Sequence, residues 1–164
     1  MEPQPQVLSA PTYAGFWPRF GAYALIDLPL QILAGFTIGR SIGFGGGIVI
    51  AVLDLPEAGV IRIIELVAAT FGFTFSWLYN AVFESSGFQA TLGKLAFGLA
   101  VTDLDGRRIS FGRATWRFLA KGLSGLFFGL GFLMIPHNAK RQGLHDDLAH
   151  TLVWRRARGT PDNK

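Results

Sequence analysis

The 164-residue chain has no cysteine, which excludes disulfide bonds, thiol catalysis and cysteine-ligated metals. Charge is also scarce, because 16% of the residues are Asp, Glu, Lys or Arg while 50% are hydrophobic. An ordinary soluble domain carries about 25% charged residues. The shortage of charge, together with 15 Phe and 21 Gly, predicts a small integral membrane protein that lies in a lipid bilayer.

The first 18 residues contain neither Lys nor Arg, so the positive region of a cleavable signal peptide is missing. Residues 1–12 are rich in Pro and Gln and are expected to form a disordered leader. A membrane domain is expected over 13–154 and a basic cytoplasmic tail over 155–164. The net charge of +4 does not indicate a nucleic-acid partner, because the basic residues flank apolar segments, as topology signals do.

The chain is organised around an apolar stretch at 16–39 that is long enough to cross a bilayer. It carries Arg19 at its start and Asp27 near its middle, where an ionised carboxylate costs roughly 3 kcal/mol or more. The two side chains are separated by about 12 Å along a helix, so we expect Asp27 to find its partner on another segment. Pro29 leaves the carbonyl four residues earlier without a donor, and together with Gln31 these groups predict a small polar pocket. A structural salt bridge and an ion or ligand site are the two alternatives.

A second apolar stretch covers 60–83 and gathers small and polar residues on one helical face, which should meet protein while the opposite face meets lipid. The residues on that face are Glu65, Ala69, Gly72, Ser76 and Asn80. Glu65 lies near one end and can pair with Arg62, three residues earlier. Residues 41–59, with their glycine run, are expected to form a flexible loop or a partly inserted segment.

Residues 92–101 are apolar but too short to cross as a helix, and they include Lys94. We therefore expect a re-entrant or interfacial placement. The following stretch, 99–111, has an Asp-Gly pair between residues that favour strands, which predicts a β-hairpin.

A third apolar segment, 113–136, starts with three basic residues spaced by four. The first, Arg113, is expected to reach the lipid headgroups. Arg117 and Lys121 lie deeper and are predicted to pair with Asp27 or Glu65. The positive-inside rule places both flanks of this segment in the cytoplasm, so we expect it to re-enter and not to cross.

The C-terminal region contains GLHDDLAHTLVW. His145, Asp147 and His150 lie within it, but their spacing matches no strong metal-binding template. We therefore expect no metal and no other cofactor.

Four pieces of the chain, in this order, resemble the RDD family of integral membrane proteins, which is named for one arginine and two aspartates. They are FWPRFGAYALID, TLGKLAFGLAVTDLDG, the later Arg117, and GLHDDLAHTLVW. The resemblance extends from about residue 13 to residue 154. It implies a small helical membrane domain with Arg19, Asp27 and Asp146 as its functional core. Asp147 stands beside Asp146, and the resemblance alone leaves open which of the two fills the role. Some members of the family are associated with cation/proton antiport.

We therefore expect an all-α membrane protein, a small bundle of about three transmembrane or re-entrant helical segments with an interfacial amphipathic or hairpin insertion. The expected location is the bacterial inner membrane, with several passes. No enzyme activity is expected, because no nucleophile–base pair is visible.

The leading functional hypothesis is transport of an ion or small solute, with exchange of a monovalent cation for a proton as one form. A homo-oligomer is expected, because three spans enclose little pathway alone. The predicted ion- or proton-binding residues are Asp27, Arg19 and Asp146. The predicted supporting network comprises Arg117, Lys121, Glu65, Gln31, Asn80, Lys94, His145 and Asp147. The alternative is a non-transporting membrane scaffold or assembly factor in which this network is structural.

Overall fold

The computed structural model describes residues 12–53, 56–126, 135–136 and 139–156. Most of the predicted leader (1–12) and of the predicted basic tail (155–164) lies outside the described residues.

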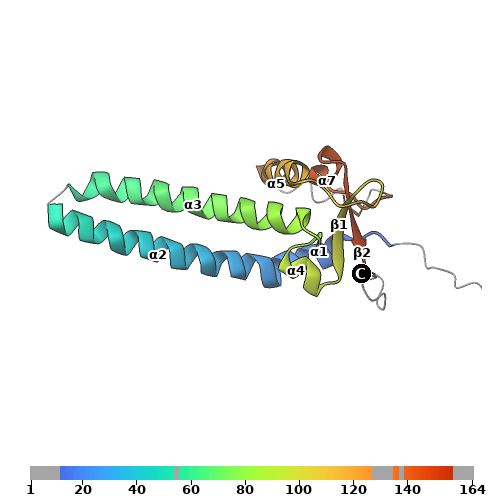
Figure 1. Ribbon diagram of the computed structural model, residues 1–164, viewed down its shortest axis with the longest axis horizontal. Coiled ribbons are helices and arrows are strands. Elements are labelled where there is room, and N and C mark those ends of the chain that lie inside the picture. Colours follow the sequence, from blue (N-terminus) through green and yellow to red (C-terminus); the bar gives the residue numbers. More distant parts are fainter. Residues whose placement is uncertain (1–11, 54–55, 127–134, 137–138, 157–164) are drawn as a thin grey trace, which may run out of the picture.

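Two long antiparallel helices form a hairpin that makes up most of the length of the molecule (Figure 1). The first helical run consists of α1 (Phe16–Ala22), η1 (Tyr23–Asp27) and α2 (Leu28–Leu53), and the second is α3 (Glu57–Ser85). Both runs are long and apolar enough to cross a membrane, and their apolar windows are 0% buried within the chain. A core helix of a soluble protein would be mostly buried, so these exposed apolar surfaces are suited to lipid.

The loop predicted at 41–59 is wrong, because α2 continues to Leu53 and α3 begins at Glu57. The glycine run lies inside a helix that packs closely on its neighbour. A Cβ atom on Gly46 would lie only 2.1 Å from Cδ1 of Ile64 in α3. Glycine here serves close helix packing, as small residues do between transmembrane helices.

A π-helical turn, η1, interrupts the first helix and ends two residues before Pro29. The Leu28 N–H donates to the carbonyl of Tyr23, five residues earlier. Because proline has no N–H and disturbs the preceding turn, the wider turn is a local response to this sequence. It ends at Asp27, which is buried.

Short elements pack together at the end of the hairpin that carries α1, and we call this region the sheet end. They are α4 (Leu92–Ala96), β1 (Leu99–Asp103), α7 (Leu144–Leu148) and β2 (Thr151–Arg155). β1 and β2 pair in antiparallel register, with Val101 opposite Val153. Their inward side chains form a core with small residues of the long helices, including Ala22 and Ala81.

The predicted β-hairpin at 99–111 forms only its turn. Asp103 N donates to the carbonyl of Arg107 at 2.9 Å, and Gly106 takes the positive φ of 80° that the turn requires. β1 then pairs with the distant β2, because the residues after the turn enter α5. The apolar stretch 92–101 is therefore a short helix followed by a core strand, and its re-entrant or interfacial placement stays a prediction.

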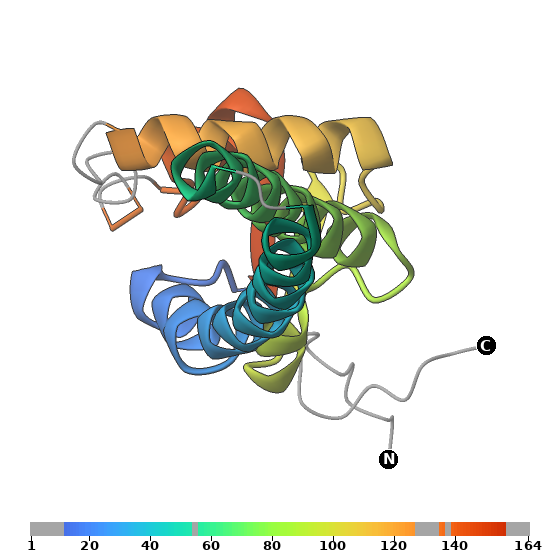
Figure 2. The same cartoon turned by 90° about the vertical axis from the view of Figure 1, so that its left-hand side faces the viewer.

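α5 (Phe111–Leu126) lies crosswise to the hairpin and packs on α3 and α7 (Figure 2). Its 16 residues reach the edge of the described range, because 127–134 lie outside it. Because β1 precedes α5 and β2 follows it, the paired strands must lie on the same side of any membrane that the hairpin crosses. The pairing of β1 with β2 supports the prediction that 113–136 does not cross singly. Residues 127–134 lie outside the described residues, so re-entry stays a prediction. The predicted fold class, a mostly helical membrane domain, is confirmed, with a small two-stranded sheet added.

Candidate functional site

Asp146, at the start of α7, is fully buried between two arginines. Its Oδ2 atom pairs with Arg19 of α1, and its Oδ1 atom accepts from Nε of Arg117 at 2.9 Å. The backbone N–H of Gly143 also donates to Oδ2 at 3.1 Å. The arginine and the second aspartate that the sequence singled out therefore form a direct ion pair between the two ends of the chain.

Glu84, near the end of α3, extends this cluster and is 1% exposed. Its Oε2 atom accepts from Arg117 at 2.7 Å, so Arg117 bridges two buried carboxylates. Its Oε1 atom pairs with Lys94 of α4 and accepts from Lys121 of α5 at 3.2 Å. Nζ of Lys121 also donates to Asn80 at 3.0 Å. We call the six charged residues of this cluster the ion network: Arg19, Glu84, Lys94, Arg117, Lys121 and Asp146.

Sequence reasoning missed Glu84, although a signal was present. Ser76 and Asn80 lie on the predicted polar face of α3, and Glu84 is the next residue at the same spacing of four. The predicted span covers 60–83, so Glu84 lies just beyond the apolar run. On the same face Glu65 and Ala69 are exposed, so the polar stripe meets protein only in its second half.

The prediction that Arg117 and Lys121 pair with Asp27 or Glu65 is wrong. Both side chains pair with Glu84, because α5 crosses α3 at the sheet end. Glu65 lies 19 residues earlier on α3, about 28 Å along the helix. It is exposed and faces Arg62 at 3.9 Å, as predicted.

Asp27 has a separate set of partners, and all of them are neutral. Its Oδ1 atom accepts from the hydroxyl of Tyr79 at 2.6 Å and from the N–H of Gly93 at 2.8 Å. Its Oδ2 atom accepts from Thr91 at 2.7 Å. The partners do lie on other segments, as predicted, but the sequence did not single out these three residues. Gln31 accepts from Ser76 at 2.6 Å and does not bond to Asp27.

Gly93 allows α4 to approach the π-helical turn. A Cβ atom at this position would lie 2.2 Å from the carbonyl oxygen of Ala22 and 2.8 Å from Cγ of Asp27. Real Cβ atoms do not approach so closely, so any side chain here would push α4 away. Glycine therefore positions the next residue, Lys94, against Glu84.

The other predicted residues divide into buried and exposed. Asp147 and His150 are exposed, so Asp146 is the carboxylate that belongs to the ion network. His145 is buried, with Nε2 at 3.4 Å from Oδ1 of Asp146. Within the part of the chain that the structure describes, no three His, Asp or Glu side chains are placed to hold a metal ion.

Burial and mutual pairing shift the pKa values of the ion network. Burial lowers the pKa of Lys94 to about 7; the carboxylate of Glu84 opposes this, while Lys121 and Arg117 reinforce it. Burial alone would raise the pKa of Asp146, but the charge of Arg117, with help from His145 and Arg19, holds it well below its ordinary value. Lys94 can thus change its charge near neutral pH, whereas Asp146 stays ionised.

We expect the protein to lose stability as the pH falls below about 6.5, the ordinary pKa of histidine. Burial lowers the pKa of His145 to about 3. Between these values the unfolded chain takes up a proton that the folded chain refuses, so stability falls with pH. The low pKa of Asp146 acts in the same direction in more acidic solution.

The measurement is the unfolding free energy in detergent between roughly pH 7 and pH 5, where one such group contributes at most about 1.4 kcal/mol per pH unit. His145→Asn should flatten this dependence. His150→Asn is the control, because His150 is exposed and its φ of 50° suits asparagine. Equal slopes in the His145→Asn variant and the unmodified protein would contradict the assignment.

A pocket of about 710 Å³ lies against the ion network. Arg19, Asp27, Lys94, Arg117 and Lys121 contribute to its lining. Much of the remaining lining is aromatic or aliphatic, with Phe16 and Phe20 from α1, Phe73 from α3 and Phe118 from α5. Charged groups and apolar walls thus meet in one cavity, an arrangement that suits a ligand.

The sequence profile of the RDD family matches residues 13–150. Two relatives come from Bacillus subtilis. The uncharacterized protein YxaI is 33% identical over 147 residues, which cover 85% of this chain and 95% of YxaI. The uncharacterized membrane protein YteJ is 27% identical over 159 residues, which cover 92% of this chain and 86% of YteJ. No solved structure matches the chain.

Proposed function

The chain belongs to the RDD family of membrane proteins, and on this premise we propose that it transports an ion or small solute by way of the pocket at the sheet end. The observation that carries the proposal is that the four basic residues of the ion network, Arg19, Lys94, Arg117 and Lys121, line a cavity of about 710 Å³. Buried ion pairs add little net stability compared with apolar packing. A network of this size beside a cavity is therefore better suited to a ligand than to stability alone.

We assign the proton-exchanging role to Lys94, because it lines the pocket and pairs with Glu84, and because burial lowers its pKa from the ordinary lysine value toward neutral pH. When Lys94 is neutral, Glu84 still keeps Arg117 and Lys121 as partners. Asp27 acts as a positioning residue, because its bond to the N–H of Gly93 holds the start of α4 and hence Lys94. Arg19 and Asp146 hold α1 and α7 against Arg117.

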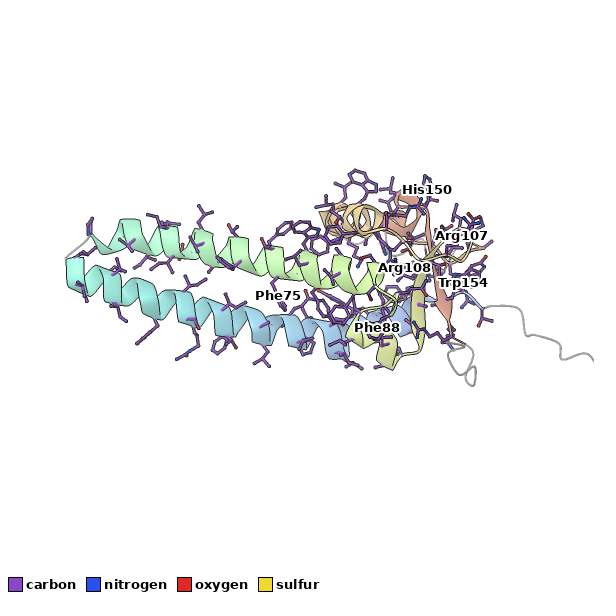
Figure 3. The ribbon with its side chains drawn as sticks, in the orientation of Figure 1. Phe75, Phe88, Arg107, Arg108, His150 and Trp154 are labelled. Carbon is purple, nitrogen blue, oxygen red and sulfur yellow. The ribbon has the colours of Figure 1, made fainter. Side chains whose placement is uncertain are left out.

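The distribution of charge supports two passes through the bacterial inner membrane. Residues 66–83 of α3 contain no charged side chain, and this stretch is about 27 Å long, close to the thickness of a bilayer core. Glu84 and the rest of the ion network then lie at one membrane surface. Figure 3 shows Arg107 and Arg108 at the sheet end, and this excess of positive charge favours a cytoplasmic position for it.

Single cysteines test this topology directly, because the chain has none of its own. Asp105→Cys and Arg155→Cys, both exposed at the sheet end, should be protected from an impermeant thiol reagent added to intact cells. Ala58→Cys, exposed at the start of α3, should react. Labelling of Asp105→Cys and Arg155→Cys on opposite sides of the membrane would contradict the paired strands.

We propose that the transporting unit is a homo-oligomer. Two spanning helices of one chain cannot surround a pathway, and the apolar residues of the hairpin are exposed along its length. A second copy packed against this surface would close the lipid-facing side of the pocket.

The alternative function is a membrane scaffold in which the ion network is structural. It is favoured by the number of satisfied partners: Arg117 bridges two carboxylates, and Asp27 accepts three hydrogen bonds. Under this alternative, variants of the ion network alter stability, and neither they nor the unmodified protein transports a solute.

Flux measured in vesicles of purified protein separates the two functions. With a pH-sensitive dye inside, a gradient of a transported monovalent ion should drive proton movement. Lys121→Gln should lower the flux about tenfold while the protein stays folded, because Glu84 retains Lys94 and Arg117. Arg113→Gln, on the same helix but outside the pocket lining, should leave the flux unchanged. Equal flux in Lys121→Gln and the unmodified protein would overturn the proposed role of the pocket.

A further inference from the structure

The side chains beside the pocket hold more positive than negative charge. Four basic residues, Arg19, Lys94, Arg117 and Lys121, surround the two carboxylates of Glu84 and Asp146. Including Asp27 leaves the balance positive when Lys94 is protonated, and Asp27 bonds only to neutral donors. Buried charges are normally balanced, because desolvating an unpaired one is unfavourable. A bound anion would complete the balance.

Lys121 is the member of the cluster best placed to meet such an anion. Its side chain is 24% exposed, compared with 9% for Arg19, 11% for Lys94 and 1% for Arg117. An ammonium group has three N–H donors, and Lys121 uses two of them on Asn80 and Glu84. In the described part of the chain the third donor is not used, so it can bind an oxyanion in the pocket.

The pocket changes from charged to apolar along α3. Asn80 lies beside Lys121, Ser76 is one turn further from the network, and Phe73 is another turn away, about 10 Å from Asn80 along the helix. Phe73 and Phe118 of α5 make an edge-to-face contact, with ring centroids 5.7 Å apart. If 66–83 span the bilayer, the apolar end of the pocket lies at the depth of the acyl chains.

The opposite wall has the same character. Phe16 and Phe20 of α1 stack with centroids 5.7 Å apart, and both line the pocket together with Tyr23. A small hydrated anion would gain nothing from these rings, whereas the alkyl chain of an amphiphile would be desolvated by them.

We propose that the pocket binds an anionic phospholipid-like amphiphile, with its phosphate at Lys121 and Lys94 and its alkyl chain between the aromatic residues of α1 and α5. Phosphate is the anionic group that membrane amphiphiles offer in quantity, and basic pockets between membrane helices suit such headgroups. The inference rests on the proposed function in that it names the ligand class of the same pocket.

Binding of defined probes to the purified full-length protein in detergent tests this inference without any measurement of flux. The probes are dioctanoyl phosphatidylglycerol, dioctanoyl phosphatidylcholine and inorganic phosphate, titrated by native mass spectrometry and calorimetry. The two lipids share a phosphodiester and chain length and differ in net charge. We expect phosphatidylglycerol to bind about tenfold tighter than phosphatidylcholine, and inorganic phosphate to bind at least about tenfold more weakly than phosphatidylglycerol.

Variants locate the site. Lys121→Gln should weaken binding of phosphatidylglycerol about fivefold to tenfold, and Lys121→Arg should restore it to within about twofold. Arg113→Gln, which removes a charge from the same helix outside the pocket lining, should change it by less than about twofold. Equal binding of the two lipids would contradict the preference for an anionic ligand. Equal binding of inorganic phosphate and phosphatidylglycerol would contradict the role of the alkyl chain. Equal effects of Lys121→Gln and Arg113→Gln would overturn the site.

The outcomes are separable from those of the flux experiment. Selective lipid binding without ion-driven proton flux would support this inference and count against transport of a monovalent ion. Proton flux without any preference for phosphatidylglycerol would support transport and overturn the ligand class.

Discussion

Replacing Arg117 by Gln should lower the free energy of unfolding by about 3–5 kcal/mol, because breaking a buried ion pair leaves uncompensated charge. Arg117 is 1% exposed and bonds to Asp146 through Nε at 2.9 Å and to Glu84 through Nη1 at 2.7 Å. Its removal leaves the buried carboxylates of Glu84 and Asp146 without the guanidinium between them. Their negative charge is then offset only by Arg19, Lys94 and Lys121. Denaturation of the purified protein in detergent, followed by circular dichroism, provides the measurement.

Two variants give this prediction its controls. Arg113→Gln, whose side chain is 41% exposed and faces Asp103 at 3.8 Å, should change stability by less than about 1 kcal/mol. Arg117→Lys should recover little, because an ammonium group cannot make the divided contacts of a planar guanidinium. If Arg117→Gln cost no more than Arg113→Gln, the two carboxylates would not depend on Arg117 as the structure indicates.

Replacing Gly93 by Ala should destabilise the protein by about 3 kcal/mol, the upper part of the usual range for overpacking. The added methyl group would lie 2.2 Å from a backbone oxygen of Ala22, and backbone cannot turn aside as a flexible side chain can. The resulting shift of α4 would also break the bond from the Gly93 N–H to Asp27. Gly112→Ala, in the first turn of α5 and with nothing within 4 Å of its added Cβ, should be neutral or slightly stabilising. Equal stability of the two variants would contradict the close approach of α4.

The partners of Asp27 lead to a related expectation for double variants. Asp27→Asn should destabilise the fold, because an amide presents a donor to hydroxyl and N–H groups that now donate to a carboxylate. A second change, Arg117→Gln, should add its own loss and not restore stability, since Arg117 is not a partner of Asp27.

The sequence was sufficient to predict two helices long and apolar enough to cross a membrane. It also singled out Arg19, Asp27 and Asp146, which the structure shows to be buried. Long uncharged runs and isolated buried charges are local signals, and the family resemblance supplied the link between distant motifs. Helix length was less predictable: the glycine run at 43–47 has the composition of a loop, yet Ile64 packs on it and the helix continues.

The pairing of charges could not be obtained from one sequence. Helical spacing shows which residues share a face, but it does not show the crosswise position of α5, which determines that Arg117 and Lys121 meet Glu84 and not Glu65. The same holds for β1, whose partner β2 lies about fifty residues further along. The Asp-Gly pair predicted the turn correctly. The hairpin that it also predicted would have paired β1 with the residues just after the turn, and that pairing is wrong.

A double-mutant cycle on Arg19 and Asp146 tests most directly the claim that one buried ion network joins the two ends of the chain. The four proteins are the unmodified chain, Arg19→Gln, Asp146→Asn and the double variant, and the quantity measured is the free energy of unfolding in detergent. Because the two side chains pair directly at 9% and 0% exposure, we predict that the double variant is less destabilised than the sum of the single variants by about 1–3 kcal/mol. Strict additivity would show that the two residues do not interact and would contradict the network.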